Sequence, residues 1–87
     1  MTKKKKYLQA AEAMKVILDD IYDYGINAKY AKKHHLTLNQ IRIMEKIYCD
    51  NRNGQVHYTI DSKVASLCND IGFVVVEHGI GFCISFE

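Results

Sequence analysis

The side chains best suited to specific recognition lie close together in this chain, at residues 39–42. They are two amides and a guanidinium: Asn39, Gln40 and Arg42. Such groups form paired hydrogen bonds with base edges in the major groove of DNA, arginine with guanine and the amides with adenine. Three lysines that would suit phosphate groups come shortly before them, namely Lys29, Lys32 and Lys33. The stretch therefore predicts contacts to both bases and DNA backbone.

Two helices are expected to position these side chains. Asn27 can cap the first helix, which should run from Ala28 to about His34. A break follows at 35–37, and Thr37 with Gln40 then forms a T-x-x-Q capping box at the start of a second helix, 38–49. Apolar residues at helical spacing should line the inner face of this second helix, namely Leu38, Ile41, Met44, Ile47 and Tyr48.

Residues 27–47 resemble the helix-turn-helix unit of many bacterial and phage regulators. Ala31 supplies the small residue where the helices cross, and Leu36 supplies the apolar plug after the turn. Many members have glycine in the turn where this chain has His35, a residue type that is found at positive φ more often than most. The resemblance implies sequence-specific DNA binding by a phage or mobile-element regulator, and a homodimer that reads symmetric half-sites.

The remaining N-terminal part predicts one long helix behind a basic tail. Apolar residues recur at helical spacing from Tyr7 to Tyr24, and Gly25 can end the helix at positive φ. The lysine run at 1–6 is expected to be a flexible basic tail. Residues 7–87 are then expected to form a single compact domain, because 87 residues leave no room for two cores.

The C-terminal part predicts a small sheet after a loop at 50–54. Alternation over 55–60 indicates a half-buried strand, with Val56, Tyr58 and Ile60 on one side. A helix from Asp61 or Ser62 to Asp70 and a hairpin of strands 73–77 and 82–86 complete the chain. The inward residues of these last elements are expected to be Val64, Leu67, Cys68, Ile71, Phe82, Ile84 and Phe86. The predicted fold is α+β: three helices, then β-α-β-β, with helices on one face of a three-stranded antiparallel sheet.

Charge is distributed unevenly between the two halves. Residues 1–48 hold ten basic and five acidic residues, a net of +5, whereas residues 49–87 hold two and five, a net of −3. A basic first half suits an anionic partner such as DNA.

Other classes of protein fit the sequence poorly. Charged residues interrupt every apolar run, which argues against a membrane span or a signal peptide. Three widely spaced cysteines suit reduced thiols in a cytoplasmic protein better than a disulfide framework. The residues that could bind zinc include no close pair of ligands: Cys49, His57, Cys68, His78 and Cys83. No catalytic motif is present, and the clustered Asp19, Asp20 and Asp23 suit a solvated helix face, so we expect neither an enzyme nor a cofactor.

A second interpretation is a protein-binding inhibitor or adaptor. Very small, tyrosine-rich α+β chains without catalytic motifs are typical of phage-encoded inhibitors of host nucleic-acid enzymes, including anti-CRISPR proteins. The acidic side chains that would meet a basic channel are Asp50, Asp61, Asp70 and Glu77. The tyrosines, too many for so small a core to bury, would favour an interface, and they are Tyr7, Tyr22, Tyr24, Tyr30, Tyr48 and Tyr58.

Overall fold

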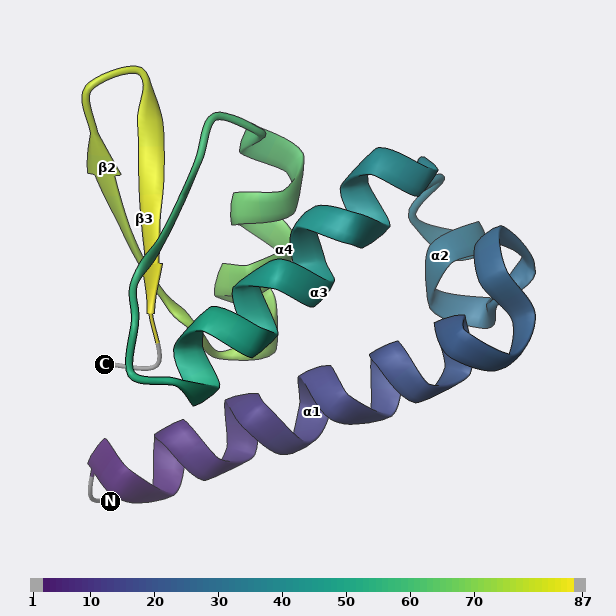
Figure 1. The fold of residues 1–87 in the computed structure, drawn as a ribbon, viewed down its shortest axis with the longest axis horizontal. Helices are drawn as coiled ribbons and strands as arrows, with labels where there is room; N and C mark the ends of the chain where they lie inside the picture. The colour runs from purple at the N-terminus through teal and green to yellow at the C-terminus, as the bar shows by residue number, and fades with distance from the viewer. Residues whose placement is uncertain (1–2, 86–87) are drawn as a thin grey trace.

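The computed structural model describes residues 3–85 of the chain, and their side chains from Gln9 onward. Within that range, helices and strands follow one another in the predicted order, which confirms the α+β fold (Figure 1). The elements are α1 Lys3–Tyr24, a short 3-10 turn Gly25–Asn27, α2 Lys29–Lys33, α3 Leu38–Arg52, β1 His57–Thr59, α4 Ser62–Ile71, β2 Val74–His78 and β3 Gly81–Ser85.

The long first helix begins earlier than the sequence indicated. It starts at Lys3 instead of Tyr7, so the lysine run assigned to a flexible tail at 1–6 forms its first turn from Lys3 onward. Lysine is a good helix former, and no residue at 3–6 caps or breaks a helix. Met1 and Thr2 lie outside the described residues.

The third helix is longer than predicted and runs through most of the expected loop at 50–54. Its last turn is held by Asn51, whose buried amide donates to the carbonyl oxygens of Ile47, at 3.0 Å, and of Ile84, at 3.2 Å. The helix ends at Arg52 with Asn53 as its C-cap, Gly54 follows at a φ of 79°, and the Gln55 N–H donates to the Asp50 carbonyl at 2.8 Å. The bond to Ile84 therefore fixes the end of α3 to β3.

The helices cover one face of the sheet, as predicted. Helix α4 packs against β2 and β3, α3 packs against β1 and β3, and α1 crosses the other three helices. In Figure 1, α1 runs along one side of the molecule, and α2 lies at the end opposite the sheet. The buried residues form one core cluster: Ala10, Met14, Ile21, Ala28, Ala31, Leu36, Ile41, Met44, Ile47, Val64, Ala65, Leu67, Cys68, Phe73 and Ile84.

The inward residues predicted for the C-terminal part mostly face this core. Val64, Leu67, Cys68 and Ile84 are buried, and Ile71 and Phe82 are partly buried against the cluster. Phe86 lies outside the described residues. Leu38 is an exception on α3, because its side chain is 61% exposed instead of facing inward.

The sheet is antiparallel with the strand order β1-β3-β2. The predicted alternation in β1 is present, but its apolar side faces outward: Val56, Tyr58 and Ile60 are exposed, and Thr59 is buried. The register explains this, because His57 is paired with the fully buried Ile84 and so lies on the helix-covered face. The apolar side of β1 is therefore on the opposite face of the sheet.

The space between β3 and the neighbouring β1 is tightly filled at Gly81. A Cβ atom at Gly81 would lie 2.6 Å from the Tyr58 ring and 2.7 Å from the Thr59 carbonyl oxygen. The Tyr58 hydroxyl donates to the His78 carbonyl at 3.3 Å, which holds the ring over Gly81. An aromatic side chain that covers a strand glycine in this way compensates for the missing side chain.

Candidate nucleic-acid interface

A four-residue turn, 34–37, joins α2 to α3 and has a defined hydrogen-bond pattern. The Leu36 N–H donates to the Ala31 carbonyl at 2.9 Å, and the His35 N–H donates to the Lys32 carbonyl at 3.3 Å. This is a Schellman motif, which places its C′ residue in the left-handed region. His35 occupies that position with a φ of 53°. It is the residue that stands where many helix-turn-helix proteins have glycine. Leu36 is buried, so it fills the plug position after the turn.

We expect the substitution His35→Gly to raise the free energy of unfolding by about 0.5–1 kcal/mol. A left-handed conformation costs a side-chain-bearing residue about 1–2 kcal/mol, and the greater entropy of unfolded glycine offsets part of that gain. Urea unfolding followed by circular dichroism measures the change. The matched control is His34→Gly, because His34 has a φ of −99° and gains nothing from glycine. Equal destabilisation by the two substitutions would contradict the strain assigned to His35.

The start of α3 has the predicted capping box. The Thr37 hydroxyl oxygen accepts from the Gln40 N–H at 3.1 Å, and the Gln40 side-chain oxygen accepts from the Thr37 N–H at 3.0 Å. The Gln40 amide nitrogen also donates to the Asp61 carboxylate at 3.3 Å. Both polar atoms of the Gln40 side chain are therefore engaged within the fold, whereas no hydrogen bond of the Asn39 or Arg42 side chain is found among the described residues.

A polar stripe runs along the exposed side of α3. It consists of Asn39, Arg42, Lys46, Cys49 and Asn53, which are all exposed and separated alternately by three and four residues. Within the described chain, no carboxylate lies within 4.0 Å of Arg42 or Lys46. Their positive charges are thus available to an external anion. The sequence prediction did not include Lys46, although it lies one helical turn beyond Arg42.

A small hollow borders the first part of this stripe. It has a volume of about 290 Å³ and lies between α1 and α3, with Leu38 and Arg42 on one side and Tyr22 on the other. Exposed Leu38 and Arg42, one helical turn apart on α3, therefore line the same hollow, and Glu45 lines it as well. The hollow thus combines an apolar side chain with a bidentate donor.

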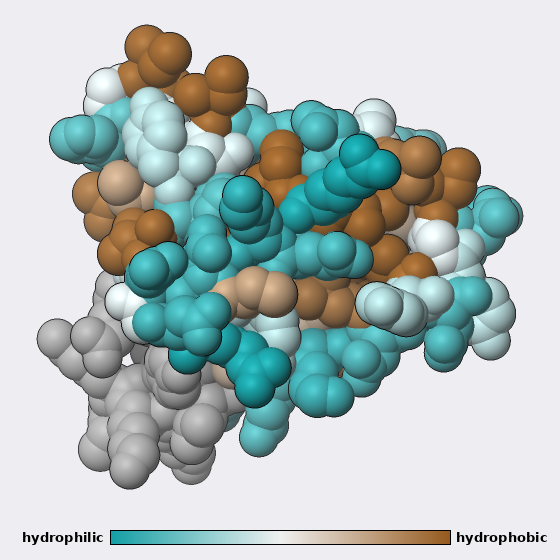
Figure 2. Space-filling view, in the orientation of Figure 1, coloured by the Kyte–Doolittle hydropathy of each residue, from teal (hydrophilic) through white to brown (hydrophobic). Residues whose placement is uncertain are grey.

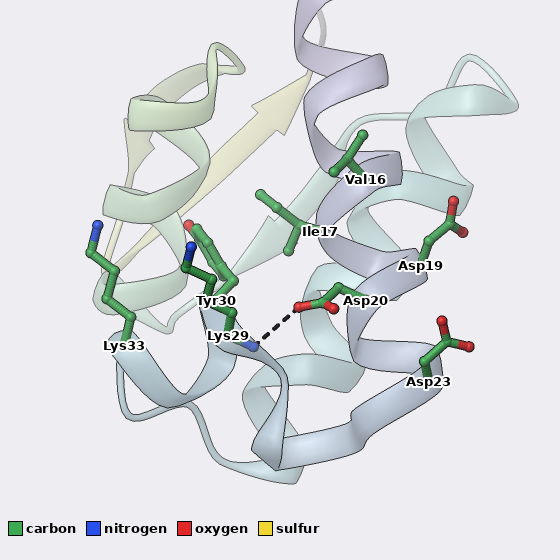
Figure 3. A pocket seen from close by; sticks show the side chains of 8 residues that line it. All are labelled: Val16, Ile17, Asp19, Asp20, Asp23, Lys29, Tyr30 and Lys33. Carbon is green, nitrogen blue, oxygen red and sulfur yellow. Dashed lines mark hydrogen bonds between the residues drawn. The ribbon is translucent and has the colours of Figure 1, made fainter.

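The predicted phosphate-binding lysines of α2 are in two different environments. Lys29 and Lys33 line a groove of about 570 Å³ between α1 and α2, and three aspartates of α1 also line it (Figure 3). Figure 3 shows Asp19 and Asp23 pointing away from the two lysines. Lys32 is exposed and does not line this groove. Of the three aspartates, Asp20 is the one that points toward α2, and its negative charge lowers the positive potential beside Lys29. Lys32, which lies outside the groove, is therefore the α2 lysine that we expect to be best placed for a phosphate.

The third aspartate of the groove has a structural role. The Asp20 carboxylate accepts a hydrogen bond from the Lys29 backbone N–H at 3.1 Å, at the first residue of α2. The prediction that Asn27 caps α2 is wrong, because Asn27 belongs to the 3-10 turn and the N-cap residue is Ala28, which has no capping side chain. Asp20 therefore supplies from α1 the acceptor that a local cap would otherwise provide.

The apolar part of the groove lining is supplied by Val16, Ile17 and Tyr30. Tyr30 is half-buried and lies against the His34 ring, with 4.4 Å between the ring centroids. Burial, with smaller electrostatic contributions from Cys68 and Asp70, raises the pKa of Tyr30 to about 12. Its hydroxyl is therefore a protonated donor at neutral pH.

The acidic residues of the alternative protein interface divide into two pairs. The Asp50 carboxylate is hydrogen-bonded to the His57 ring nitrogen Nδ1 at 2.9 Å, and Asp61 caps α4 by accepting from the Val64 N–H at 3.0 Å. Asp70 and Glu77 are exposed. Asp50 and Asp61 therefore form hydrogen bonds within the fold, whereas no such bond of the Asp70 or Glu77 side chain is found among the described residues.

The described tyrosines are also divided between surface and core. Tyr22, Tyr24 and Tyr58 are exposed, whereas Tyr30 and Tyr48 are partly buried against the core. The side chain of Tyr7 lies outside the described residues. Tyr22 lines the hollow that borders the stripe on α3.

The structure offers little for metal binding or thiol chemistry. The described residues include no group of three His, Cys, Asp or Glu side chains that could hold a metal ion. Cys49 is exposed, Cys83 is half-buried and Cys68 is buried, and none forms a disulfide. Burial raises the pKa of the Cys68 thiol to about 12, which makes it unreactive at neutral pH. No helix in residues 3–85 has the length and apolar character needed to cross a membrane.

Comparison with known proteins found no family model, no curated protein and no solved structure that matches this chain.

Proposed function

We propose that this protein binds double-stranded DNA, with the first half of α3 in the major groove. The observation that supports this most is the row of exposed Asn39, Arg42 and Lys46 side chains on a helix with a capped start. The major groove is wide enough to admit a helix, and recognition helices present their N-terminal residues to base edges. We expect the protein to act in the cytoplasm as a phage or mobile-element regulator that occupies its site on DNA.

Each side chain has an expected role in this complex. Arg42 would bind guanine through two hydrogen bonds, and Asn39 would bind adenine in the same way. Leu38, exposed one helical turn before Arg42, would contact a thymine methyl group. Lys46 and Lys32 would bind phosphates and set the register of α3 on the duplex.

The first test is salt-dependent binding to a mixed-sequence duplex, measured by fluorescence anisotropy. We expect clear binding at low salt that weakens steeply as salt rises, because phosphate contacts release counterions. Lys32→Ala should weaken binding to all sequences equally and make the slope of log K against log salt shallower by about 0.9. The control is Lys15→Ala on α1, where the ammonium is ion-paired with Asp19 at 3.3 Å and should not bind DNA. Failure of the protein to bind any duplex at low salt would rule out the proposed function.

One observation favours an inhibitor of a nucleic-acid enzyme as the second candidate. Exposed Glu77 borders a hollow of about 400 Å³ between α4 and the sheet, away from the α3 stripe. An acidic side chain at such a hollow could bind a basic channel of a partner. Under this alternative, Glu77→Gln would relieve inhibition of a host nuclease, and Glu45→Gln on α3 would leave the inhibition unchanged.

A further inference from the structure

The face of the sheet opposite the helices is apolar. The register places Tyr58, Cys83 and Val76 side by side on this face, one from each strand. Val74 lies two residues before Val76 in β2, so its side chain is on the same face. The large apolar side chains at its strands and turn are 40–86% exposed: Val56, Tyr58, Ile60, Val74, Val76 and Ile80. Figure 2 shows hydrophobic residues gathered at the upper left of the view, over β2 and the β2–β3 turn. We call this surface, with Cys83 at its centre, the outer sheet face.

The residue pattern of the strands is that of a sheet buried on both sides. Antiparallel strands with one face in water alternate between apolar inward and polar outward residues. Strand β1 has the reverse pattern, since the polar His57 and Thr59 lie on the core side and the apolar residues point outward. Strand β2 begins with the unbroken apolar run Val74–Val76. The sequence is thus suited to a partner on the outer sheet face, and no described helix lies there (Figure 1).

We propose that a second copy of this chain covers the outer sheet face, sheet against sheet, about a two-fold axis. The strand positions on this face also include the exposed His78, whose ring is edge-on to that of Tyr58. They include no Lys, Arg, Asp or Glu, so a second copy would bring no like charges of these residue types together. A nucleic acid would require cations here, and a basic protein would require anions. An apolar surface without formal charges is instead complementary to another of the same kind, and a two-fold interface uses one patch twice.

The size of the outer sheet face fits this occupant. Burial of a Val, Ile or Tyr side chain removes on the order of 100 Å² of apolar surface from water. Six side chains that are about half-exposed or more would therefore bury several hundred Å² per copy, enough for the apolar centre of a standard interface of about 800 Å² per partner. Two packed sheets lie about 10 Å apart, which leaves room for side chains of this size to interdigitate.

Dimerisation also suits so short a chain. A chain of this length buries a smaller fraction of its surface than larger domains do, so its stability margin is narrow. Association of two copies would stabilise the folded state by mass action, and this stabilisation grows with the logarithm of the ratio of protein concentration to Kd. The inference does not depend on DNA binding, because its test contains no DNA and either proposal can fail alone.

The test is sedimentation equilibrium of the whole chain over a wide range of concentrations. We expect a dimer for the natural sequence and a monomer for Val76→Lys, which would place an ammonium group at the middle of the interface. The matched control is Val16→Lys, the same change at a 70% exposed valine on α1, and it should remain dimeric. A monomeric natural protein at every concentration would overturn the inference, and so would a dimer of Val76→Lys that keeps its far-UV circular dichroism spectrum.

A second measurement needs no variant. Cys83 lies at the centre of the outer sheet face, whereas Cys49 is exposed on α3. Alkylation of Cys83 by a maleimide should slow as the protein concentration rises, because the dimer covers this thiol, and Cys49 in the same sample should react at a constant rate. A Cys83 rate that does not depend on concentration would count against a dimer through this face.

Discussion

Replacement of Arg42 by alanine is expected to lower affinity for the cognate duplex by about 5- to 150-fold, which corresponds to the 1–3 kcal/mol of one bidentate base contact. The Arg42 guanidinium is exposed on the first turns of α3, and no described carboxylate lies within 4.0 Å to neutralise it. The loss should be largest for the preferred sequence and small for unrelated duplexes. Selection from a randomised duplex, followed by competition binding, measures both quantities.

Two further substitutions test whether geometry or charge carries this effect. Arg42→Lys keeps the charge but loses the planar pair of donors, so it should retain the salt dependence and lose the sequence preference. Arg52→Ala is the matched control on the same helix, where the guanidinium lies 5.6 Å from the centre of the Tyr48 ring near the end of α3. Equal losses of sequence preference for Arg42→Ala and Arg52→Ala would contradict the assigned role of Arg42.

The substitution Gly81→Ala is expected to destabilise the fold by about 1–3 kcal/mol or more, as overpacking of a close contact does. The added methyl group would lie 2.6 Å from the Tyr58 ring and 2.7 Å from the Thr59 carbonyl oxygen. The ring can rotate away, but the carbonyl is part of the β1 backbone, so β1 and β3 must move apart. Because a chain of this length has a total stability of roughly 4–13 kcal/mol, the loss should be clear in urea unfolding.

A double variant separates the two clashes at Gly81. Tyr58→Ala removes the ring and leaves the Thr59 carbonyl in place. We expect Gly81→Ala to remain strongly destabilising in the Tyr58→Ala background, since the backbone contact persists. If the double variant were as stable as Tyr58→Ala alone, the side chain and not the strand spacing would be the constraint.

Periodicity predicted the elements of this fold because burial imposes it on each element separately. The inner faces of α3 and α4 follow from spacings of three and four residues, and Met44 and Leu67 are buried as expected. The same reasoning gave the alternation of β1, with its apolar residues on one side, but it did not say which side faces the core. Alternation defines two faces of a strand, and the partner strand decides which one meets the core. For β1, that partner is β3, which begins more than twenty residues later.

The candidate site was predictable only where its contacts are local. The Thr37–Gln40 box and the left-handed His35 involve neighbours within five residues, so sequence spacing indicates them. The Asp20 cap of α2 and the bond from Gln40 to Asp61 join residues 9 and 21 positions apart, and no local pattern indicates them. Lys46 could have been found by extending the spacing from Arg42 by one turn.

Two carboxylates outside α2 and α3 accept hydrogen bonds from these helices, and this affects whether the α2–α3 pair can fold when it is separated from the rest of the chain. The α2 helix obtains its first N–H acceptor from Asp20 on α1, and the Gln40 side chain at the start of α3 is held by Asp61 ahead of α4. A synthetic peptide covering 27–52 would contain neither carboxylate. The helix pair is therefore not a portable module, and its transfer to another scaffold would require an acidic residue at each of these two positions in the host.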